Sequence, residues 1–359
     1  MNFFSEEFFN EPFSLSKSDK ENYIISSSNA LSKHHYNKCP EYRRIIESLF
    51  DDQTNADDLP SIPFIPVQIF KNFDLLSIKK DQISRTMTSS GTSGQAVSRI
   101  FLDKKTAFNQ SKILNKIVCD FIGSERLPFY VVDAETVISD RKSFSARGAG
   151  ILGFSRFGKG REFILDDDME ISIKRLEEIC LANKNKKILF FGFTFMIWQH
   201  LLLPLQKLNK KFSFKNAVVI HGGGWKKLND LEVSNNHFKK VFKEFLGINN
   251  VYNYYGMVEQ TGSIFFECEF GHIHTSNFSE VIIRDPISFE ELPHGESGLI
   301  QLISLLPESY PGHSILSEDM GAIVGEDDCK CGRNGKYFEI YGRVKNAEIR
   351  GCSDTYQNT

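Results

Sequence analysis

Short apolar runs alternate with helix-like segments between about residue 83 and residue 280. The runs at 128–132, 187–193 and 217–222 are continuous and rich in β-branched and aromatic residues, as in strands buried on both faces. Between and after them, residues 169–181 and 233–246 repeat apolar positions at helical spacing. This alternation predicts βαβ units and a mainly parallel sheet.

Different patterns flank this region. Residues 40–50 predict an amphipathic helix, and Pro60, Pro63 and Pro66 then require an extended connector. Beyond about residue 280, strand-like pieces separated by Gly, Pro and Asp indicate a smaller β-rich unit. The expected organisation is a helical N-terminal region with its extended connector (1–80), an α/β core (81–280), and a β-rich unit with a C-terminal tail (281–359).

Composition narrows the class of protein. With 359 residues, 41% hydrophobic residues and a formal net charge of -3, the chain has no global basic field, so nucleic-acid binding is not expected. The first residues are acidic, unlike a secretory signal, which predicts a cytoplasmic protein. The longest apolar tract, 188–205, is interrupted by polar residues and proline, so we expect a buried strand and helix with no membrane span. The odd number of cysteines, 7, favours thiols or metal ligands.

A stretch of hydroxyl residues and glycines lies between an extended segment, 82–87, and a strand-like segment, 97–102. We expect a hairpin-like connection there. The lysine and helix of a Walker loop are missing, but backbone N–H groups and hydroxyls can wrap phosphate oxygens. The predicted phosphate-binding residues are Ser89, Ser90, Gly91, Thr92, Ser93 and Gly94. The alternative is a polar loop facing solvent.

Three later segments add candidate ligand-binding groups. The strand at 217–222 runs into Gly222, Gly223 and Gly224, where a flat ring can lie against the backbone. The segment 251–262 places aromatic rings, including Tyr255, beside a single acid, Glu259, which suits Mg²⁺. Asp319 and Arg343 follow as an isolated carboxylate and guanidinium, which match ribose hydroxyls and phosphate. Taken singly, such tyrosines usually belong to a core and such aspartates to turns.

The order of these segments resembles the adenylate-forming superfamily over residues 85–345. Within it the chain is most similar to the acyl-protein synthetases of the LuxE type, with support from IPFIPVQIFK (62–71), VIHGGGWKKL and RGCSDT (350–355). This group is related to phenylacetate-CoA ligase-like enzymes. The resemblance implies an α/β fold: the large N-terminal domain of the superfamily, with mainly parallel sheets, helices and a small β-rich unit, lacking the usual mobile C-terminal domain. The hinge aspartate of the superfamily is replaced by Asn346.

The resemblance also implies a reaction. ATP would activate a carboxylic acid as acyl-AMP, and the acyl group would pass to Cys352 as a thioester. Ser89–Gly94 would hold the β- and γ-phosphates, Glu259 the Mg²⁺, Asp319 the ribose, and Arg343 the ribose or phosphate. Adenine would lie between the glycines at 222–224 and Tyr255.

The family analogy favours a fatty acid as substrate and an acyl reductase or acyltransferase as partner protein. Five aromatic residues either line a tunnel for the alkyl chain or fill a core: Phe190, Phe191, Phe193, Phe195 and Trp198. Two alternative functions remain: an acyl- or aryl-CoA ligase, and a non-catalytic nucleotide-binding scaffold.

Cysteines and histidines also predict a metal site. Cys268 and His274 are spaced for joint ligation, and Cys329 and Cys331 lie in a tight pair far downstream. His272 offers a second imidazole. We hypothesise a structural Zn²⁺ bound by Cys268, His274, Cys329 and Cys331, as in some related phenylacetate-ligase-like enzymes. The alternative is four reduced or solvent-facing residues.

Overall fold

The computed structural model describes residues 11–89, 96–138, 146–225 and 233–344. By compactness the chain divides into two units. The first contains residues 1–89, 93–123 and 256–348, and the second contains 90–92, 124–255 and 349–359. We describe each unit by itself, and the three consecutive ranges expected from the sequence remain a prediction.

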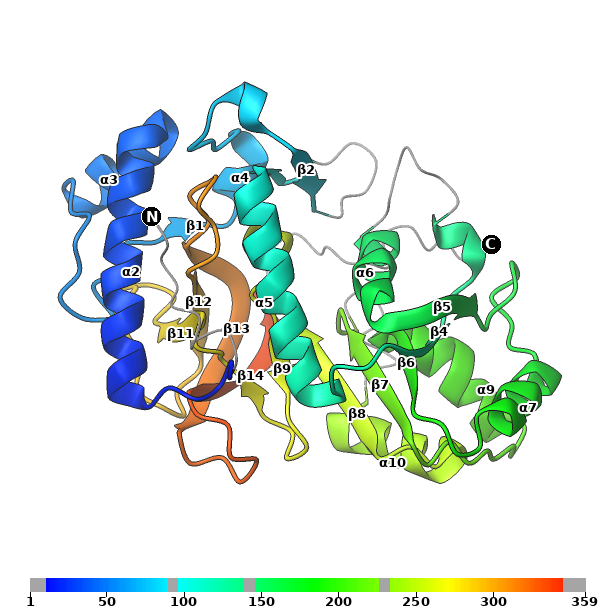
Figure 1. Ribbon diagram of the computed structural model, residues 1–359. Helices are drawn as coiled ribbons and strands as arrows, with labels where there is room; N and C mark the ends of the chain where they lie inside the picture. The colour runs from blue at the N-terminus through cyan, green and yellow to red at the C-terminus, as the bar shows by residue number, and fades with distance from the viewer. Residues whose placement is uncertain (1–10, 90–95, 139–145, 226–232, 345–359) are drawn as a thin grey trace. The chain divides into compact units, whose positions relative to one another are not determined.

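The second unit contains a five-stranded parallel sheet with the order β5-β4-β6-β7-β8 (Figure 1). Its strands are β4 (Leu127–Val131), β5 (Gly158–Phe163), β6 (Ile188–Phe193), β7 (Ala217–Gly222) and β8 (Asn250–Tyr255). β6 and β7 are buried at every position, which explains their unbroken apolar sequences. The prediction of a mainly parallel α/β sheet is therefore confirmed.

Helices connect these strands. They are η2 (Glu135–Ile138), α6 (Ala146–Phe154), η3 (Ser155–Phe157), α7 (Ile173–Ala182), α8 (Thr194–Ile197), the π-helical turn η4 (Trp198–Leu202), α9 (Leu203–Lys207) and α10 (Asn235–Leu246). Local sequence sets the ends of α10: the Ser234 side chain accepts a hydrogen bond from the N–H of His237, and Gly247 adopts the left-handed conformation after the last turn.

The aromatic residues of this unit pack against one another. Phe191 stacks on Phe154 of α6 with ring centroids 4.6 Å apart, and Trp198 lies 6.1 Å from Phe238 of α10. All five aromatic residues considered for an alkyl tunnel are at most 4% exposed. These contacts favour the core-filling alternative, because each ring is surrounded by side chains of the same unit.

The first unit is built on a mostly antiparallel sheet with the order β11-β12-β13-β14-β10-β9. Its strands are β9 (Phe265–Glu267), β10 (Ile273–His274), β11 (Ser279–Arg284), β12 (Gly298–Ser304), β13 (Ser314–Glu326) and β14 (Lys336–Arg343), and the short β1 (Ile65–Pro66) pairs in parallel with β13. A separate antiparallel pair, β2 (Arg85–Thr88) with β3 (Arg99–Leu102), confirms the predicted hairpin.

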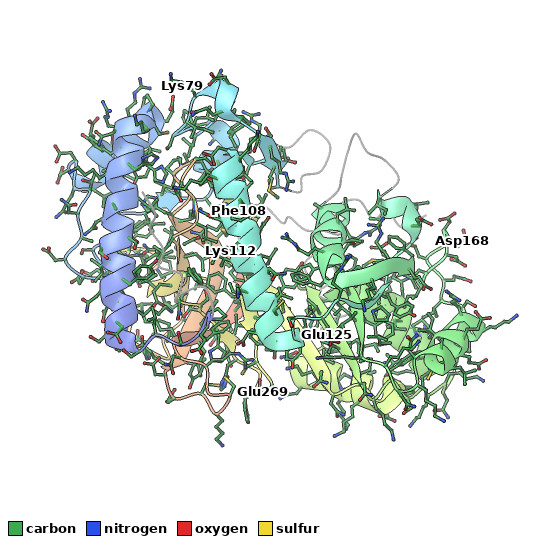
Figure 2. All side chains as sticks on the ribbon, viewed as in Figure 1. Lys79, Phe108, Lys112, Glu125, Asp168 and Glu269 are labelled. Atoms are coloured by element: carbon green, nitrogen blue, oxygen red, sulfur yellow. The ribbon has the colours of Figure 1, made fainter. Side chains whose placement is uncertain are left out.

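The first unit contains two long helices that lie against the sheet, and several shorter ones (Figure 1). They are α2 (Lys17–Lys38), α3 (Pro40–Phe50), α4 (Ile69–Asn72), η1 (Lys80–Gln82), α5 (Lys104–Ile122) and η6 (Val258–Gln260). Capping side chains start the two long helices: Ser16 accepts from Asp19 N–H, and Asp103 accepts from Thr106 N–H. α5 contacts the sheet through Phe121, which stacks on Phe266 at 5.0 Å, whereas Phe108 on the same helix is 67% exposed (Figure 2).

The helix predicted at 40–50 is confirmed, but of the five apolar residues that the pattern places on one side of it, not all are buried. Tyr42 and Ile46 are buried, Ile45 and Phe50 are partly buried, and Leu49 is 58% exposed. Leu49 therefore faces solvent, whereas the next residue, Phe50, still packs against the core. No helix among the described residues is long and apolar enough to cross a membrane.

A buried ion pair joins α2 to the sheet of the first unit. Lys20 Nζ lies 3.2 Å from Glu280 Oε2, both side chains are 2% exposed, and Lys20 also donates to Thr275 Oγ1 at 2.7 Å. Burial lowers the pKa of Lys20. The pKa of Glu280 is lowered despite burial, because the charges of Lys20 and of Lys336, itself 5% exposed, act on it together. Glu280 therefore compensates two buried cations.

This arrangement predicts unequal costs for breaking the pair. Glu280→Gln leaves two buried ammonium groups without their carboxylate, and we expect a loss of about 3–5 kcal/mol in the free energy of unfolding. Lys20→Met leaves the charge of Lys336 still acting on Glu280, so the loss should be smaller. Urea denaturation of both variants measures this order, and an equal or reversed order would contradict the shared role of Glu280.

Candidate functional site

Glu259 lies in the short helix η6 and is almost completely buried. Its side chain is 6% exposed, and burial raises the pKa of its carboxyl. The Ser98 hydroxyl lies near enough to lower this pKa, although its geometry falls short of a hydrogen bond, and the charges of Lys71 and Arg343 act in the same direction. A desolvated carboxyl of this kind suits a bound cation, because a cation favours the ionised form.

Asp319 and Arg343 are brought together by strand pairing. β13 and β14 run antiparallel with Asp319 directly opposite Arg343, and Arg343 Nε lies 3.5 Å from Asp319 Oδ1. The Asp319 side chain is 18% exposed and the Arg343 side chain is 34% exposed, so both remain accessible to a ligand. Asp319 N–H donates to the Ser317 hydroxyl at 3.2 Å, which fixes the backbone beside the carboxylate.

Ser89 closes the hairpin formed by β2 and β3. Its N–H donates to Ser98 O at 3.1 Å, and its hydroxyl accepts from Ser98 N–H at 2.9 Å. The first residue of the predicted phosphate-binding segment is thus held at the loop end of the paired strands. The rest of that segment, residues 90–94, lies outside the described residues, and so do Asn346 and Cys352.

The predicted adenine-binding residues belong to the second unit. Gly222 is the last residue of β7, followed by Gly223 and Gly224, and Tyr255 is the last residue of β8, half-buried. A Cβ atom at Gly222 would lie 2.6 Å from the Tyr254 ring, so only glycine fits between the strand and that ring. Both segments leave the carboxyl ends of neighbouring parallel strands, the usual ligand-binding edge of such sheets.

The four predicted metal ligands converge in the first unit. One ligand atom from each of Cys268, His274, Cys329 and Cys331 lies within 4.8 Å of the others. Cys268 follows β9, His274 ends β10, and the other two cysteines lie in the turn between β13 and β14. The Sγ atoms of Cys268 and Cys329 are 3.8 Å apart, and Cys331 Sγ lies 3.4 Å from His274 Nε2.

The donor set and spacing of this cluster fit zinc. With Zn–S bonds of ~2.3 Å, two tetrahedral thiolates are about 3.8 Å apart. Burial lowers the pKa of His274 to about 3, which keeps its imidazole in the neutral form that binds metals. His272 approaches the same group, with Nδ1 3.2 Å from Cys329 Sγ.

Some features of the described chain were not predicted. Tyr310 donates a hydrogen bond to the backbone carbonyl of Glu259 at 2.9 Å, and nothing in its local sequence distinguishes it from an ordinary core tyrosine. In the second unit, Arg147 Nε lies 2.9 Å from Asp133 Oδ2 just past the end of β4, and burial raises the pKa of Asp133 to about 6. Both contacts join residues that are distant in the sequence, so no local sequence pattern could have predicted them.

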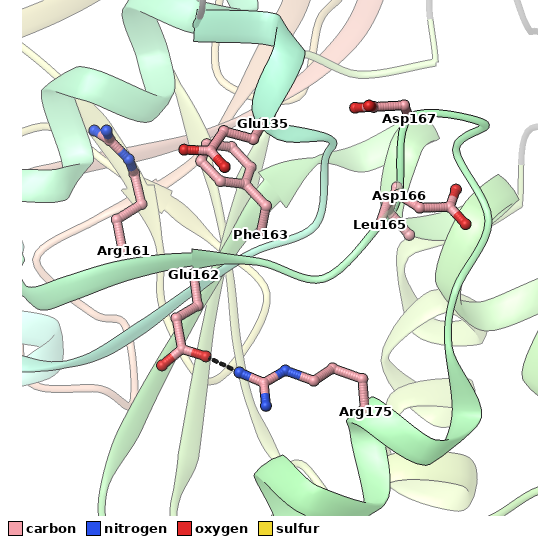
Figure 3. Close-up of a pocket in the computed structure, with 8 residues that line it drawn as sticks. All are labelled: Glu135, Arg161, Glu162, Phe163, Leu165, Asp166, Asp167 and Arg175. Atoms are coloured by element: carbon pink, nitrogen blue, oxygen red, sulfur yellow. Dashed lines mark hydrogen bonds and ion pairs between the residues drawn. The ribbon is translucent and has the colours of Figure 1, made fainter.

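A charged recess of about 450 Å³ lies beside β5 in the second unit (Figure 3). Glu162 forms an ion pair with Arg175 across it. It is lined by Glu135, Arg161, Glu162, Phe163, Leu165, Asp166, Asp167 and Arg175, and contains none of the predicted site residues. Because both signs of charge line it, the recess has no clear preference for a ligand.

Known proteins resemble this chain along nearly its whole length. A family model described as acyl-protein synthetase, LuxE, matches residues 6–359. A long-chain-fatty-acid–luciferin-component ligase from Vibrio harveyi is 26% identical over 337 residues, which cover 89% of this chain and 84% of the relative. The protein of the same name from Aliivibrio fischeri is 25% identical over 339 residues, with 90% and 85% covered.

Solved structures share the fold. A 2-hydroxyisobutyryl-CoA ligase, solved in an open conformation with 2-HIB-AMP and CoA, superposes with a TM-score of 0.69 and 16% identity, covering 93% of this chain and 77% of that one. The same ligase in the postadenylation state with 2-HIB-AMP gives a TM-score of 0.67. The prediction of an adenylate-forming α/β fold is confirmed by these matches.

The turn after Glu259 depends on a glycine. Gly262 has φ +94°, and a Cβ atom there would lie 2.8 Å from the Gln110 Cα atom. We expect Gly262→Ala to lower the free energy of unfolding by more than about 1 kcal/mol, since both the backbone conformation and the contact with α5 become unfavourable. Gly256→Ala is the matched control, because its nearest neighbour would be 3.8 Å away. Thermal denaturation compares them, and equal melting temperatures would disprove this explanation.

Proposed function

Because this chain belongs to the LuxE family of acyl-protein synthetases and is a ligase, we propose that it activates a long-chain fatty acid with ATP and then carries the acyl group on Cys352. The observation that carries the proposal is the family match over residues 6–359. The buried carboxyl of Glu259 and the Asp319–Arg343 pair support it, since they offer the charges that a bound nucleotide requires.

In the proposed first step, a carboxylate oxygen of the acid bonds to the α-phosphorus of ATP, and the bond from that phosphorus to the bridging oxygen breaks. Pyrophosphate leaves and acyl-AMP remains. Glu259 would hold Mg²⁺, which neutralises phosphate charge, while Asp319 accepts hydrogen bonds from the ribose hydroxyls and Arg343 binds ribose or phosphate. The acid is already ionised at neutral pH, so charge neutralisation and positioning matter more than a general base.

In the proposed second step, the Cys352 thiolate attacks the acyl carbon, the thioester bond forms, and AMP leaves. A free thiol has a pKa of about 8.5, so a few per cent of it is thiolate at neutral pH, enough to react with a mixed anhydride. Arg350, two residues away in the sequence, favours the thiolate.

The curated relatives are named long-chain-fatty-acid–luciferin-component ligases, which supports a fatty acid as substrate and a protein as acyl acceptor. We propose an acyl reductase or an acyltransferase as the partner that exchanges the acyl group with Cys352. Binding of that partner would let the thioester transfer its acyl group to the partner before water hydrolyses it.

Self-acylation can be measured directly. Purified protein incubated with ATP, Mg²⁺ and a panel of labelled acids should gain a hydroxylamine-labile acyl adduct, which peptide mapping places on Cys352. Cys352→Ser should abolish the adduct while pyrophosphate release continues, because activation precedes transfer. Cys180→Ser is the matched control and should keep both activities, since Cys180 is a partly buried thiol of α7 without a proposed role.

Three results would redirect the proposal. An adduct that persists as a thioester in Cys352→Ser would assign the acceptor to another thiol. Pyrophosphate release with consumption of coenzyme A, indifferent to Cys352, would make the protein an acyl-CoA ligase. ATP binding without acid-dependent pyrophosphate release would leave a nucleotide-binding scaffold.

We also propose that Cys268, His274, Cys329 and Cys331 bind one structural Zn²⁺. The support is the close approach of four donor atoms, three sulfurs and one nitrogen, in a set that zinc prefers. The ion would connect the turn between β13 and β14 to β9 and β10. It would stabilise the first unit without taking part in acyl transfer.

Metal analysis tests the zinc site. Protein purified without chelator should contain about one zinc per chain, and Cys329→Ser/Cys331→Ser should contain none and melt at a lower temperature. Cys119→Ser, a substitution of a partly buried thiol on α5, should retain the metal. Absence of stoichiometric zinc from the unsubstituted protein would remove the proposal.

A further inference from the structure

The connection between β12 and β13, residues 305–313, packs against the backbone of Glu259. Tyr310 in this connection is fully buried, and its hydroxyl donates to the Glu259 backbone carbonyl at 2.9 Å. The same hydroxyl accepts from Gln110 Nε2 of α5 at 3.3 Å. Because its one proton is committed to the carbonyl, the Tyr310 hydroxyl links α5 to the backbone that carries the carboxyl group.

The residue after Glu259 is attached to the same connection. Gln260 Nε2 donates to Leu302 O and to Gly312 O, both at 2.9 Å, and the Gln260 side chain is completely buried. Gly312 must lack a side chain, since a Cβ atom there would lie 2.3 Å from the Tyr310 ring and 2.7 Å from Glu259 O. Two hydrogen bonds thus hold η6 against residues 305–313, and a third connects it to β12.

The connection is itself held from its other side by histidines. His35 Nε2 donates to Pro307 O at 3.0 Å, and its Nδ1 accepts from the Ser77 hydroxyl at 2.7 Å. His313 lies 2.9 Å from the Ser32 hydroxyl, and its ring stacks on that of His35 at 5.0 Å. These residues are buried, so the segment behind Glu259 is packed between α2 and η6.

We propose that Tyr310 is a positioning residue for the Mg²⁺ ligand Glu259, acting through the hydrogen bond to the Glu259 carbonyl. The inference rests on the proposed role of Glu259 in binding Mg²⁺. Tyr310 holds the backbone carbonyl of Glu259, the residue that carries the carboxylate. Rotation of the backbone at Glu259 would therefore move the carboxylate. Holding the peptide in advance lowers the ordering cost of metal binding.

The experiment measures acid-dependent exchange of pyrophosphate into ATP at varied free Mg²⁺. In the full-length protein, Tyr310→Phe removes one hydroxyl and keeps the ring. We expect the half-saturating Mg²⁺ concentration to rise about three- to tenfold, as for the loss of one buried hydrogen bond. The KM for the fatty acid should change less than about twofold, since neither Tyr310 nor Glu259 has a proposed role in binding that substrate.

Tyr42→Phe is the matched control. Tyr42 is 1% exposed, belongs to the same hydrophobic core as Tyr310, and its hydroxyl makes no hydrogen bond within the described residues. Removing this hydroxyl should leave the Mg²⁺ dependence unchanged. Gln110→Leu is a second test should Tyr310→Phe fail to fold, and it should raise the half-saturating Mg²⁺ by a smaller factor, because the Tyr310–Glu259 bond remains.

Glu259→Gln separates failure of the inference from failure of the proposed function. If Glu259→Gln leaves the Mg²⁺ dependence unchanged, the metal-binding role of Glu259 is wrong. If Glu259→Gln weakens Mg²⁺ use but Tyr310→Phe does not, or if Tyr310→Phe lowers only the melting temperature, Tyr310 is a structural residue and the inference is overturned. If Tyr310→Phe does not fold, the test passes to Gln110→Leu. An unchanged half-saturating Mg²⁺ concentration in Gln110→Leu would then also overturn the inference.

Discussion

The antiparallel pairing of β13 with β14 is the constraint on which most of the first unit depends. The pairing sets Asp319 opposite Arg343 near one end of the two strands, and Cys329 and Cys331 lie in the turn at the other end. The register shifts twice between these ends, between Met320 and Gly321 and between Ile323 and Gly325. β13 is further held by β12 on one side and by the short parallel strand β1. A shift of one residue in the pairing beside Asp319 would turn its side chain to the opposite face of the sheet and separate it from Arg343.

Burial acts on two glutamates of this unit with opposite results. Glu280 is surrounded by buried ammonium groups, and its pKa is lowered even though its carboxylate is desolvated. Glu259 receives only partial compensation from the charges of Lys71 and Arg343, so burial dominates and its pKa is raised. The charge of Glu280 is balanced by lysines of the same chain, and this arrangement contributes to stability. The arrangement around Glu259 favours a cation from outside, and this difference in compensation supports a metal-binding role for Glu259.

The two units use their sheets differently. In the second unit, the central parallel strands β6 and β7 are buried on both faces, and the carboxyl ends of β7 and β8 present Gly222 and Tyr255. In the first unit, antiparallel strands bring distant charged residues side by side. The family match identifies a ligase, whereas the solved neighbours at 16% identity establish the fold alone, so the residue roles depend on the chemistry of each group.

The sequence by itself determined several of the strands and helices, because periodicity and capping are local. The apolar runs became β6 and β7, residues 40–50 became α3, and the segments flanking the hydroxyl-rich loop became a hairpin. Its motifs also proposed Glu259, Asp319, Arg343 and four cysteine and histidine residues as candidate site residues. Only the tertiary structure decided which of these meet: Cys268 lies 61 residues from Cys329, and Tyr310 lies 51 residues from Glu259. Such contacts depend on strand register and on packing between distant segments, which no local pattern of residues encodes.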